Sequence, residues 1–172
     1  RLVTPDGRDV RPTPEKVKEA LFSALQFDIE GRRVLDLFAG SGQLGIEALS
    51  RGAVSATLVD SSAVSSKIIK TNIENCGFGD RARIIQSDYL AFCAMCNDVF
   101  DIVFLDPPYK AGYLMTALKA VLPLVSDFGF VICEHPPEVE TLEKVGGFEI
   151  YRTYRYGKVN VTVYRKGEAN EG

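Results

Sequence analysis

The sequence predicts an α/β fold with a doubly wound, mostly parallel, seven-stranded sheet that ends in an antiparallel hairpin. Short β-rich apolar runs alternate with helical patterns along most of the chain, which is typical of right-handed β-α-β crossovers. The last two β-rich runs alternate apolar with polar residues and are joined by a single glycine, as in a hairpin with one solvated face. The chain of 172 residues has no repeat or linker-like tract, so we expect one domain, 1–172.

The amino-terminal lead-in, residues 1–30, contains one expected helix. Thr13 is a good N-cap and Pro14 is a good first helical residue. An apolar stripe follows at helical spacing and predicts a face that packs on the sheet. The stripe consists of Val17, Ala20, Leu21, Ala24 and Leu25.

Five buried strands then alternate with five helices. The apolar runs predict parallel strands at 33–38, 56–60, 83–87, 101–105 and 128–134. Helical patterns predict helices at 42–50, 62–75, 89–96, 113–121 and 137–145. The hairpin is expected from strands at 147–156 and 158–165, joined at Gly157.

Composition and charge exclude several classes of protein. Apolar residues make up 46% of the chain and charged residues 25%, close to globular averages, and the longest apolar runs are far shorter than the roughly 20 residues that span a bilayer. The start of the chain has no apolar core of signal-peptide type, so we expect a cytoplasmic protein with no membrane association. The net charge of -3 excludes a general polycation. The four scattered cysteines predict reduced thiols and no metal site; they are Cys76, Cys93, Cys96 and Cys133.

A glycine-rich loop follows the first expected strand. Residues 40–45 read Gly-Ser-Gly-Gln-Leu-Gly, which matches G-x-G-x-x-G and opens a helix, as in nucleotide-type cofactor sites. Asp60 ends the second strand, where it can accept hydrogen bonds from the ribose hydroxyls of either NAD or S-adenosylmethionine. Asp36 distinguishes the two cofactors, because its carboxylate would repel a pyrophosphate and attract the ammonium and sulfonium of S-adenosylmethionine.

Aspartates fall at or just beyond the ends of four successive strands: Asp36, Asp60, Asp88 and Asp106. Ligands of open α/β sheets bind outside the carboxyl ends of the strands, so these residues predict an anionic cleft that suits a cationic cofactor. Any one of them is equally well explained as a turn former or helix cap. Four along one edge favour the cleft.

The candidate catalytic motif is Asp106-Pro107-Pro108-Tyr109, which follows an apolar strand. Two prolines cannot extend the strand, so the chain must leave the sheet there with a stiffened backbone. The Asp106 carboxylate and the Pro107 carbonyl can together accept both hydrogens of an exocyclic amino group. Tyr109 offers an aromatic face on which a flipped base can stack.

These residues resemble a known family. The Asp-Pro-Pro-Tyr element is similar to the (D/N/S)-P-P-(Y/F/W) motif of methyltransferases that modify exocyclic amino groups, and residues 36–45 are similar to their cofactor loop. With Arg11-Pro12-Thr13 and residues 19–22 and 47–53, nearly the whole chain resembles the RsmD-like family. That resemblance implies a Rossmann-like class I methyltransferase that uses S-adenosylmethionine to methylate the N2 amino group of a guanine in 16S ribosomal RNA, within the small ribosomal subunit.

The resemblance also implies roles for individual residues. The catalytic set would be Asp106, Pro107 and Tyr109, which hold the target guanine. The cofactor-binding set would be Asp36, Phe38, Gly40, Ser41, Gly42, Asp60, Ser61, Ser87, Asp88 and Tyr89, with Asp60 on the ribose and Asp88 on the adenine amino group. The substrate-binding set would be Arg11, Thr13, Pro108, Arg152 and Arg155.

The terminal hairpin carries a local basic and aromatic surface. Between residues 147 and 166, five basic residues accompany a single acidic residue, Glu149, and Tyr151, Tyr154 and Tyr156 are interleaved with them. We expect phosphate contacts there and at the amino-terminal end; a solvated strand face is the alternative for the hairpin. His135, which precedes two prolines, has no evident partner and is expected in a loop. The basic residues are Arg152, Arg155, Lys158, Arg165 and Lys166.

The leading hypothesis is therefore a monomeric RNA guanine-N2 methyltransferase that requires no metal. Three alternatives stay open. The same motif can serve adenine N6 in DNA or RNA, the fold can belong to a non-catalytic RNA-binding factor, and the glycine loop alone is compatible with an NAD-dependent dehydrogenase.

Overall fold

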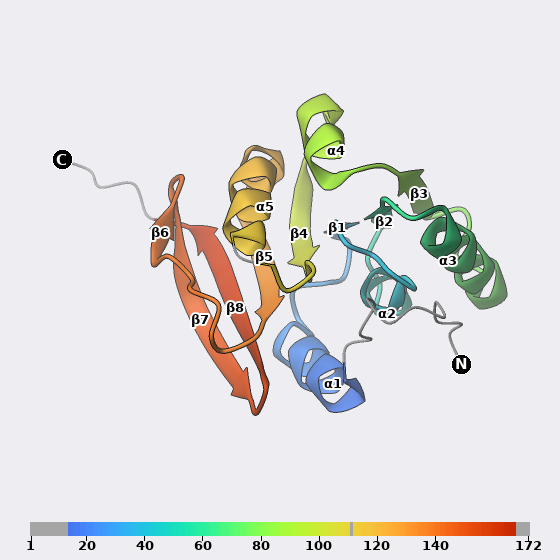
Figure 1. Ribbon diagram of the computed structural model, residues 1–172. Helices are drawn as coiled ribbons and strands as arrows, with labels where there is room; N and C mark the ends of the chain where they lie inside the picture. The colour runs from blue at the N-terminus through green and yellow to red at the C-terminus, as the bar shows by residue number, and fades with distance from the viewer. Residues whose placement is uncertain (1–13, 111, 168–172) are drawn as a thin grey trace.

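One eight-stranded sheet forms the centre of the computed structural model, which describes residues 14–110 and 112–167 (Figure 1). The strands are β1 (Arg33–Asp36), β2 (Ser55–Asp60), β3 (Ala82–Gln86), β4 (Phe100–Leu105), β5 (Val125–His135), β6 (Lys144–Val145), β7 (Phe148–Tyr156) and β8 (Val159–Lys166). Their order across the sheet is β3-β2-β1-β4-β5-β8-β7-β6. The first five are parallel, and β8, β7 and β6 continue the sheet in antiparallel fashion. The predicted fold class is confirmed.

Helices cover both faces of the sheet (Figure 1). They are α1 (Glu15–Ala24), α2 (Gln43–Ser50), α3 (Ala63–Cys76), α4 (Tyr89–Met95) and α5 (Tyr113–Val121), which runs into the short 3-10 helix η1 (Leu122–Leu124). Because successive strand residues point to opposite faces, the core divides into two layers. One layer joins α1, α2 and α3 to residues such as Phe104, and the other joins α4 and α5 to residues such as Leu105.

The lead-in helix differs in detail from the expectation. It begins at Glu15, and Pro14 is the N-cap residue with an extended backbone rather than the first helical residue; Thr13 lies outside the described residues. Ala24 is exposed, while Phe22 is completely buried. The Phe22 ring lies 5.8 Å from the Phe104 ring, between centroids, so α1 is held against the sheet by a larger side chain than the expected stripe provides.

The predicted helix at 137–145 is wrong. The chain after β5 forms turns and then β6, whose two residues pair with Phe148 and Glu149 of β7. Pro136 and Pro137 remove two backbone donors at the start of this segment, and the tertiary pairing with β7 decides its end. This short edge strand is why the sheet has eight strands and not seven.

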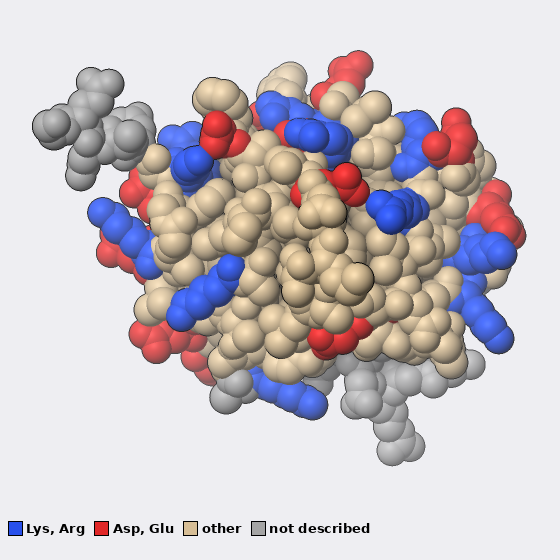
Figure 2. Space-filling view, turned by 90° about the horizontal axis from the view of Figure 1, so that it is seen from above, with Lys and Arg blue, Asp and Glu red and all other residues tan. Residues whose placement is uncertain are grey.

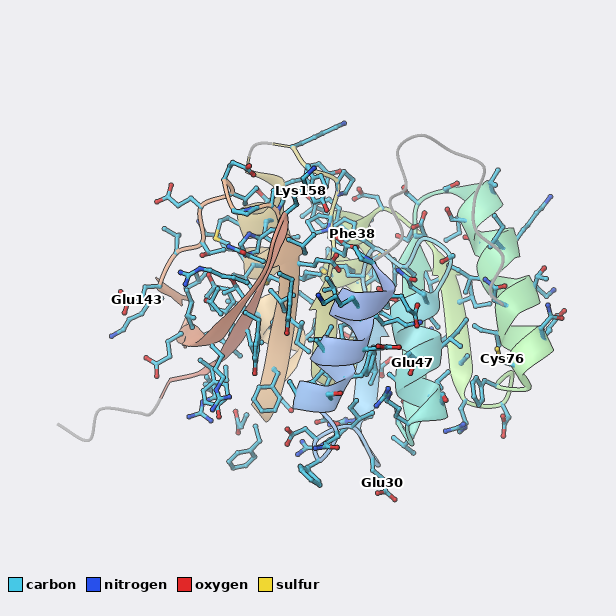
Figure 3. The ribbon with its side chains drawn as sticks, turned by 90° about the horizontal axis from the view of Figure 1, so that it is seen from below. Glu30, Phe38, Glu47, Cys76, Glu143 and Lys158 are labelled. Carbon is cyan, nitrogen blue, oxygen red and sulfur yellow. The ribbon has the colours of Figure 1, made fainter. Side chains whose placement is uncertain are left out.

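The register of the hairpin sets the position of its turn. His135 at the end of β5 pairs with Asn160, whereas Phe130 pairs with Arg165. The turn at Gly157, with its positive φ of 67°, therefore lies at the edge where β1 to β5 end, which we call the carboxyl edge; the opposite edge is the amino edge. Figure 3 shows Lys158 and Phe38 at one end of the sheet and Glu30, which precedes β1, at the other.

The described residues include no helix that is both long and apolar enough to cross a membrane. All four cysteines are free thiols, as expected.

Candidate active site

Acidic residues mark the ends of all five parallel strands. Asp36 and Asp60 are the last residues of β1 and β2, Asp88 follows β3, and Asp106 follows β4, as predicted. The fifth, Glu134, lies one residue before the end of β5, and the sequence reasoning missed it. The signal was available, because Glu134 interrupts an apolar run at the same place in its strand as the four aspartates.

The glycine loop is shaped by its contact with β2. Gly42 has a φ of 86° and is the N-cap residue of α2, a conformation that side chains with a Cβ rarely adopt. A Cβ on Gly45 would lie 2.8 Å from Leu58 Cδ2, so a larger residue there would force Leu58 or α2 to shift. The backbone N–H of Gly40 donates to Asp60 Oδ2 at 2.9 Å. The sequence G-x-G-x-x-G thus brings the loop against the ends of β1 and β2.

Asp36 lies beneath this loop. Its side chain is 1% exposed and accepts a hydrogen bond from the backbone N–H of Gly45 at 3.2 Å. Burial raises the pKa of Asp36 to about 7, with Gly45 opposing the shift and the nearby acids Asp60 and Glu134 adding to it. Asp36 is therefore covered by the glycine loop, and any effect that it has on a ligand at the carboxyl edge would be through its charge and not through direct exposure.

Asp60 and Asp88 both bind backbone N–H groups. Asp60 bridges Gly40 and Ser62, with both distances at 2.9 Å, so it fastens the glycine loop to the end of β2. Asp88 is the N-cap of α4, and its Oδ2 accepts from Leu90 and Ala91. The helix-cap interpretation is thus correct for Asp88, and any contact with a ligand would be additional to it.

An aromatic cluster joins three of the strand ends. Phe38 follows β1, Tyr89 begins α4, and Tyr113 begins α5. The ring centroids lie 5.1 Å apart for Phe38 and Tyr89, and 5.2 Å apart for Tyr89 and Tyr113. Phe38 and Tyr89 were expected at the cofactor site, whereas Tyr113 was not, because no sequence pattern connects it to them. The cluster forms an apolar wall at the carboxyl edge on the α4 and α5 side.

The Asp-Pro-Pro-Tyr motif leaves the sheet as expected. Asp106 directly follows β4, Pro107 is buried, and Pro108 is exposed. Tyr109 is 46% exposed, so its ring offers surface to a ligand. Burial raises the pKa of Asp106 well above its usual range, and the neighbouring carboxyls of Glu134 and Asp36 raise it further.

His135 is not a loop residue, so that expectation is wrong. It ends β5, is 3% exposed, and its Nε2 lies 2.8 Å from Thr162 Oγ1 while its Nδ1 lies 2.8 Å from the Pro136 carbonyl oxygen. Burial lowers the pKa of His135, so we assign it a neutral structural role between β5 and β8. Its partner comes from a strand that is distant in sequence, which is why no local pattern indicated it.

The basic residues of the hairpin do not form one surface, because they lie on different faces and at different distances from the turn. Arg155 pairs with Asn160 near the turn, at the carboxyl edge, while Arg152 pairs with Val163 farther along β7. The two arginines point to opposite faces, because Arg152 shares the face of Val163, and Arg155 follows Tyr154 of that same face. Arg165 pairs with Phe130 in the middle of β5, farther from the carboxyl edge, and its guanidinium lies 3.9 Å from the centre of the Tyr151 ring. Arg11 and Thr13 lie outside the described residues.

The described residues contain no group of three or more His, Cys, Asp or Glu side chains placed to hold a metal ion. At the carboxyl edge, Asp36, Asp60 and Asp88 instead accept hydrogen bonds from backbone N–H groups, and Glu134 is buried. What the edge offers a ligand is negative charge, a glycine loop and aromatic surface.

Comparisons with known proteins agree with this arrangement. The family model described as conserved hypothetical protein 95 matches residues 1–165. The ribosomal RNA small subunit methyltransferase D of Escherichia coli K12 is 37% identical over 172 aligned residues, which cover 90% of this chain and 84% of that protein. The solved structure of YhhF from Escherichia coli has a TM-score of 0.85 at 32% identity, over 96% of this chain and 91% of that one.

A more distant structure shares the fold. It is RsmC of Thermus thermophilus, a 16S rRNA N2 methyltransferase solved with S-adenosylmethionine and guanosine. Its TM-score is 0.75 at 24% identity, and the match covers 94% of this chain and 45% of that one.

Proposed function

This chain belongs to the RsmD family, described as conserved hypothetical protein 95, and from that premise we propose that it methylates the N2 amino group of a guanine in small-subunit ribosomal RNA. The chain is an S-adenosylmethionine-dependent methyltransferase. The name of its Escherichia coli relative supports ribosomal RNA as the substrate. The choice of guanine N2 within that RNA is the step that the site must support.

The carboxyl edge fits the cofactor. S-adenosylmethionine, when bound, supplies an electrophilic methyl group on a positively charged sulfur. The buried charge of Asp36 beneath the glycine loop favours a cation above it. Asp60 holds the loop against the end of β2, and a ribose hydroxyl could donate a further hydrogen bond to it. The cluster of Phe38, Tyr89 and Tyr113 supplies an apolar surface for a purine ring.

One observation carries the assignment of an exocyclic amino group as the target. Asp106, at the end of β4, stands beside Pro107, whose carbonyl is a second acceptor on a backbone that two prolines stiffen. Together they can accept both hydrogens of an exocyclic amino group. Tyr109, next to them and 46% exposed, can stack on the extruded base. The amino nitrogen of a purine is a poor nucleophile, so these residues act mainly by positioning it in line with the methyl group.

The proton balance requires little from the protein before methyl transfer. As the nitrogen forms its bond to the methyl carbon, the bond from carbon to sulfur breaks and its electron pair stays on sulfur. The nitrogen then carries a positive charge and releases one proton. Asp106, which in its ionised form accepts a hydrogen of that amino group, would take up this proton, and its raised pKa makes that ionised form a stronger base than an exposed carboxylate.

Transfer of labelled methyl groups to small ribosomal subunits that lack the modification tests the proposal. Digestion to nucleosides should give labelled N2-methylguanosine, and the Asp106→Asn variant should give almost none while still binding the cofactor in calorimetry. Labelled N6-methyladenosine would replace the proposed target with adenine. Failure to label any subunit despite cofactor binding would exclude this RNA as the substrate.

A further inference from the structure

We propose that Glu134 determines base specificity: its carboxylate accepts the N1–H of the target guanine beside Asp106 and Pro107, which accept the N2 hydrogens. The inference rests on the proposed function and deepens it, because it explains how the site would choose guanine over adenine. Glu134 would be a binding residue for the base, in addition to the motif that holds the amino group.

Strand register places Glu134 next to Asp106. β4 and β5 are parallel neighbours, in which Phe104 pairs with Ile132 and Leu105 pairs with Cys133. The residues that come next, Asp106 after β4 and Glu134 in β5, therefore lie side by side. Adjacent strands lie about 4.8 Å apart, which brings the two side chains within reach of one base edge.

The two carboxyls also share a face of the sheet. Phe104 and Ile132 belong to the core layer beneath α1 and α2, while Leu105 and Cys133 belong to the opposite layer. Alternation returns Asp106 and Glu134 to the first face. They lie close enough for the charge of Glu134 to raise the pKa of Asp106.

Because this pair is shielded from water, it favours a ligand that presents N–H donors to both carboxylates. Glu134 is 5% exposed, and a buried carboxylate that faces an acceptor instead of a donor is strongly unfavourable. Guanine presents three N–H groups in a row along one edge, two on N2 and one on N1. Adenine presents its amino group beside N1, which has a lone pair and no hydrogen. A row of acceptors from Pro107 through Asp106 to Glu134 therefore complements guanine and opposes adenine.

A substrate change and a side-chain change together test the contact. The mapped target guanine is replaced by 2-aminopurine, which keeps the N2 amino group but has no hydrogen on N1. For the unmodified enzyme we expect kcat/KM to fall at least about 100-fold on this substrate, because a site built to bind a donor rejects an analogue that lacks it. The Glu134→Gln variant can turn its amide to donate to N1, so we expect its preference for guanine over 2-aminopurine to shrink to about 10-fold or less.

The controls separate recognition from folding. Glu134→Gln should still bind the cofactor and should unfold at a temperature no lower than that of the parent, and Glu138→Gln, at an exposed position that follows β5, should behave like the parent on both substrates. Glu134→Asp, which keeps the charge, should retain a strong preference for guanine.

Two outcomes would overturn the proposal. If the unmodified enzyme methylates 2-aminopurine as well as guanine, N1–H is not read, and this result needs no variant to fold. If Glu134→Gln loses activity equally on both substrates and leaves the preference unchanged, Glu134 only supports the structure. A product other than N2-methylguanosine with the natural substrate would instead contradict the proposed function itself.

Discussion

The pKa values of acidic residues are shifted in opposite directions at the two edges of the sheet. At the carboxyl edge, burial raises the pKa of Asp36 to about 7 and raises that of Asp106 well above its usual range. At the amino edge, Asp101 accepts hydrogen bonds from Arg33, which hold its pKa below the usual range despite partial burial. Arg83 and Asp98 form a further ion pair nearby.

The paired charges of the amino edge stabilise the fold, whereas the buried acids of the carboxyl edge do not. The amino edge pairs its charges around a hollow of about 380 Å³ that Arg33, Arg81, Arg83 and Asp98 help to line, and such pairs contribute modestly to stability. On the side of α4 and α5, basic and acidic residues are interspersed around the margin of the molecule (Figure 2). The buried acids of the carboxyl edge oppose stability on their own. The proposed function gives these acids partners, namely the positive charge of the cofactor and the N–H groups of the target base.

The largest expected effect is on chemistry at the carboxyl edge. Asp106→Asn keeps the shape of the side chain but removes its charge and turns part of it into a donor, so we expect kcat to fall about 1,000-fold, an effect typical of losing a group that acts in the transition state. Single-turnover methyl transfer measures it. Asp98→Asn at the amino edge is the matched control and should stay within about twofold of the parent; an equal loss in both would remove the distinction between the edges.

We expect the free energy of unfolding to fall both when the pH is raised and when it is lowered, because the two edges respond to pH in opposite directions. Because the folded pKa of Asp36 is above the ordinary value near 4, its contribution is fully present below about pH 4 and is lost as the pH rises to about 7. Because the folded pKa of Asp101 is lowered, its contribution is present above about pH 4 and is lost as the pH falls through the folded pKa. We expect maximal stability between about pH 4 and 5, and a loss of up to about 3 kcal/mol by pH 8.

Denaturant unfolding at several pH values provides the measurement. Asp36→Asn should flatten the decline above pH 5, and Asp101→Asn should flatten the decline at the acid end. Stability that rises steadily to pH 8 in the parent would show that the carboxyl edge carries no such penalty.

Cofactor affinity should also depend on the buried charge. Asp36→Asn removes the charge and keeps an oxygen for the N–H of Gly45, so we expect the Kd for S-adenosylmethionine to rise about 10-fold at pH 8, or about 1.4 kcal/mol. S-adenosylhomocysteine, whose sulfur is neutral, should be affected less. Calorimetry with both ligands measures the difference, and an equal change for the two would mean that Asp36 shapes the loop without acting on the sulfonium.

The smallest predicted effect concerns the hairpin, where the edges can be compared within one strand. Arg155→Glu, near the carboxyl edge, should weaken binding to small-subunit ribosomal RNA about fivefold and reduce its salt dependence. Arg152→Glu, on the opposite face and with its guanidinium over the Tyr151 ring, should change affinity less than twofold. Filter binding at two salt concentrations checks both, and equal effects would favour a diffuse basic surface.

Local patterns predicted most of the fold and much of the candidate site. The apolar runs located the parallel strands to within a few residues, and the ends of parallel strands must share one edge, so the sequence alone placed Asp36, Asp60 and Asp106 together. Pairings between distant segments could not be found in this way. The Thr162 partner of His135, the position of Glu134 beside Asp106, and β6 all depend on the register of strands that are far apart in sequence. The opposite orientations of Arg152 and Arg155 follow from their odd spacing, a signal that was present and not used.

The short edge strand β6 affects how readily copies of this protein could aggregate through the edge of the sheet. A long, flat edge strand is a template on which another chain can add a strand and begin an aggregate. Here β6 covers Phe148 and Glu149, and the register of β7 shifts between Ile150 and Arg152, which increases the local twist. The remaining edge carries Arg152 and Arg155, so a strand that docks there meets a bent backbone and two positive charges. The hairpin that completes the sheet thereby also limits its growth.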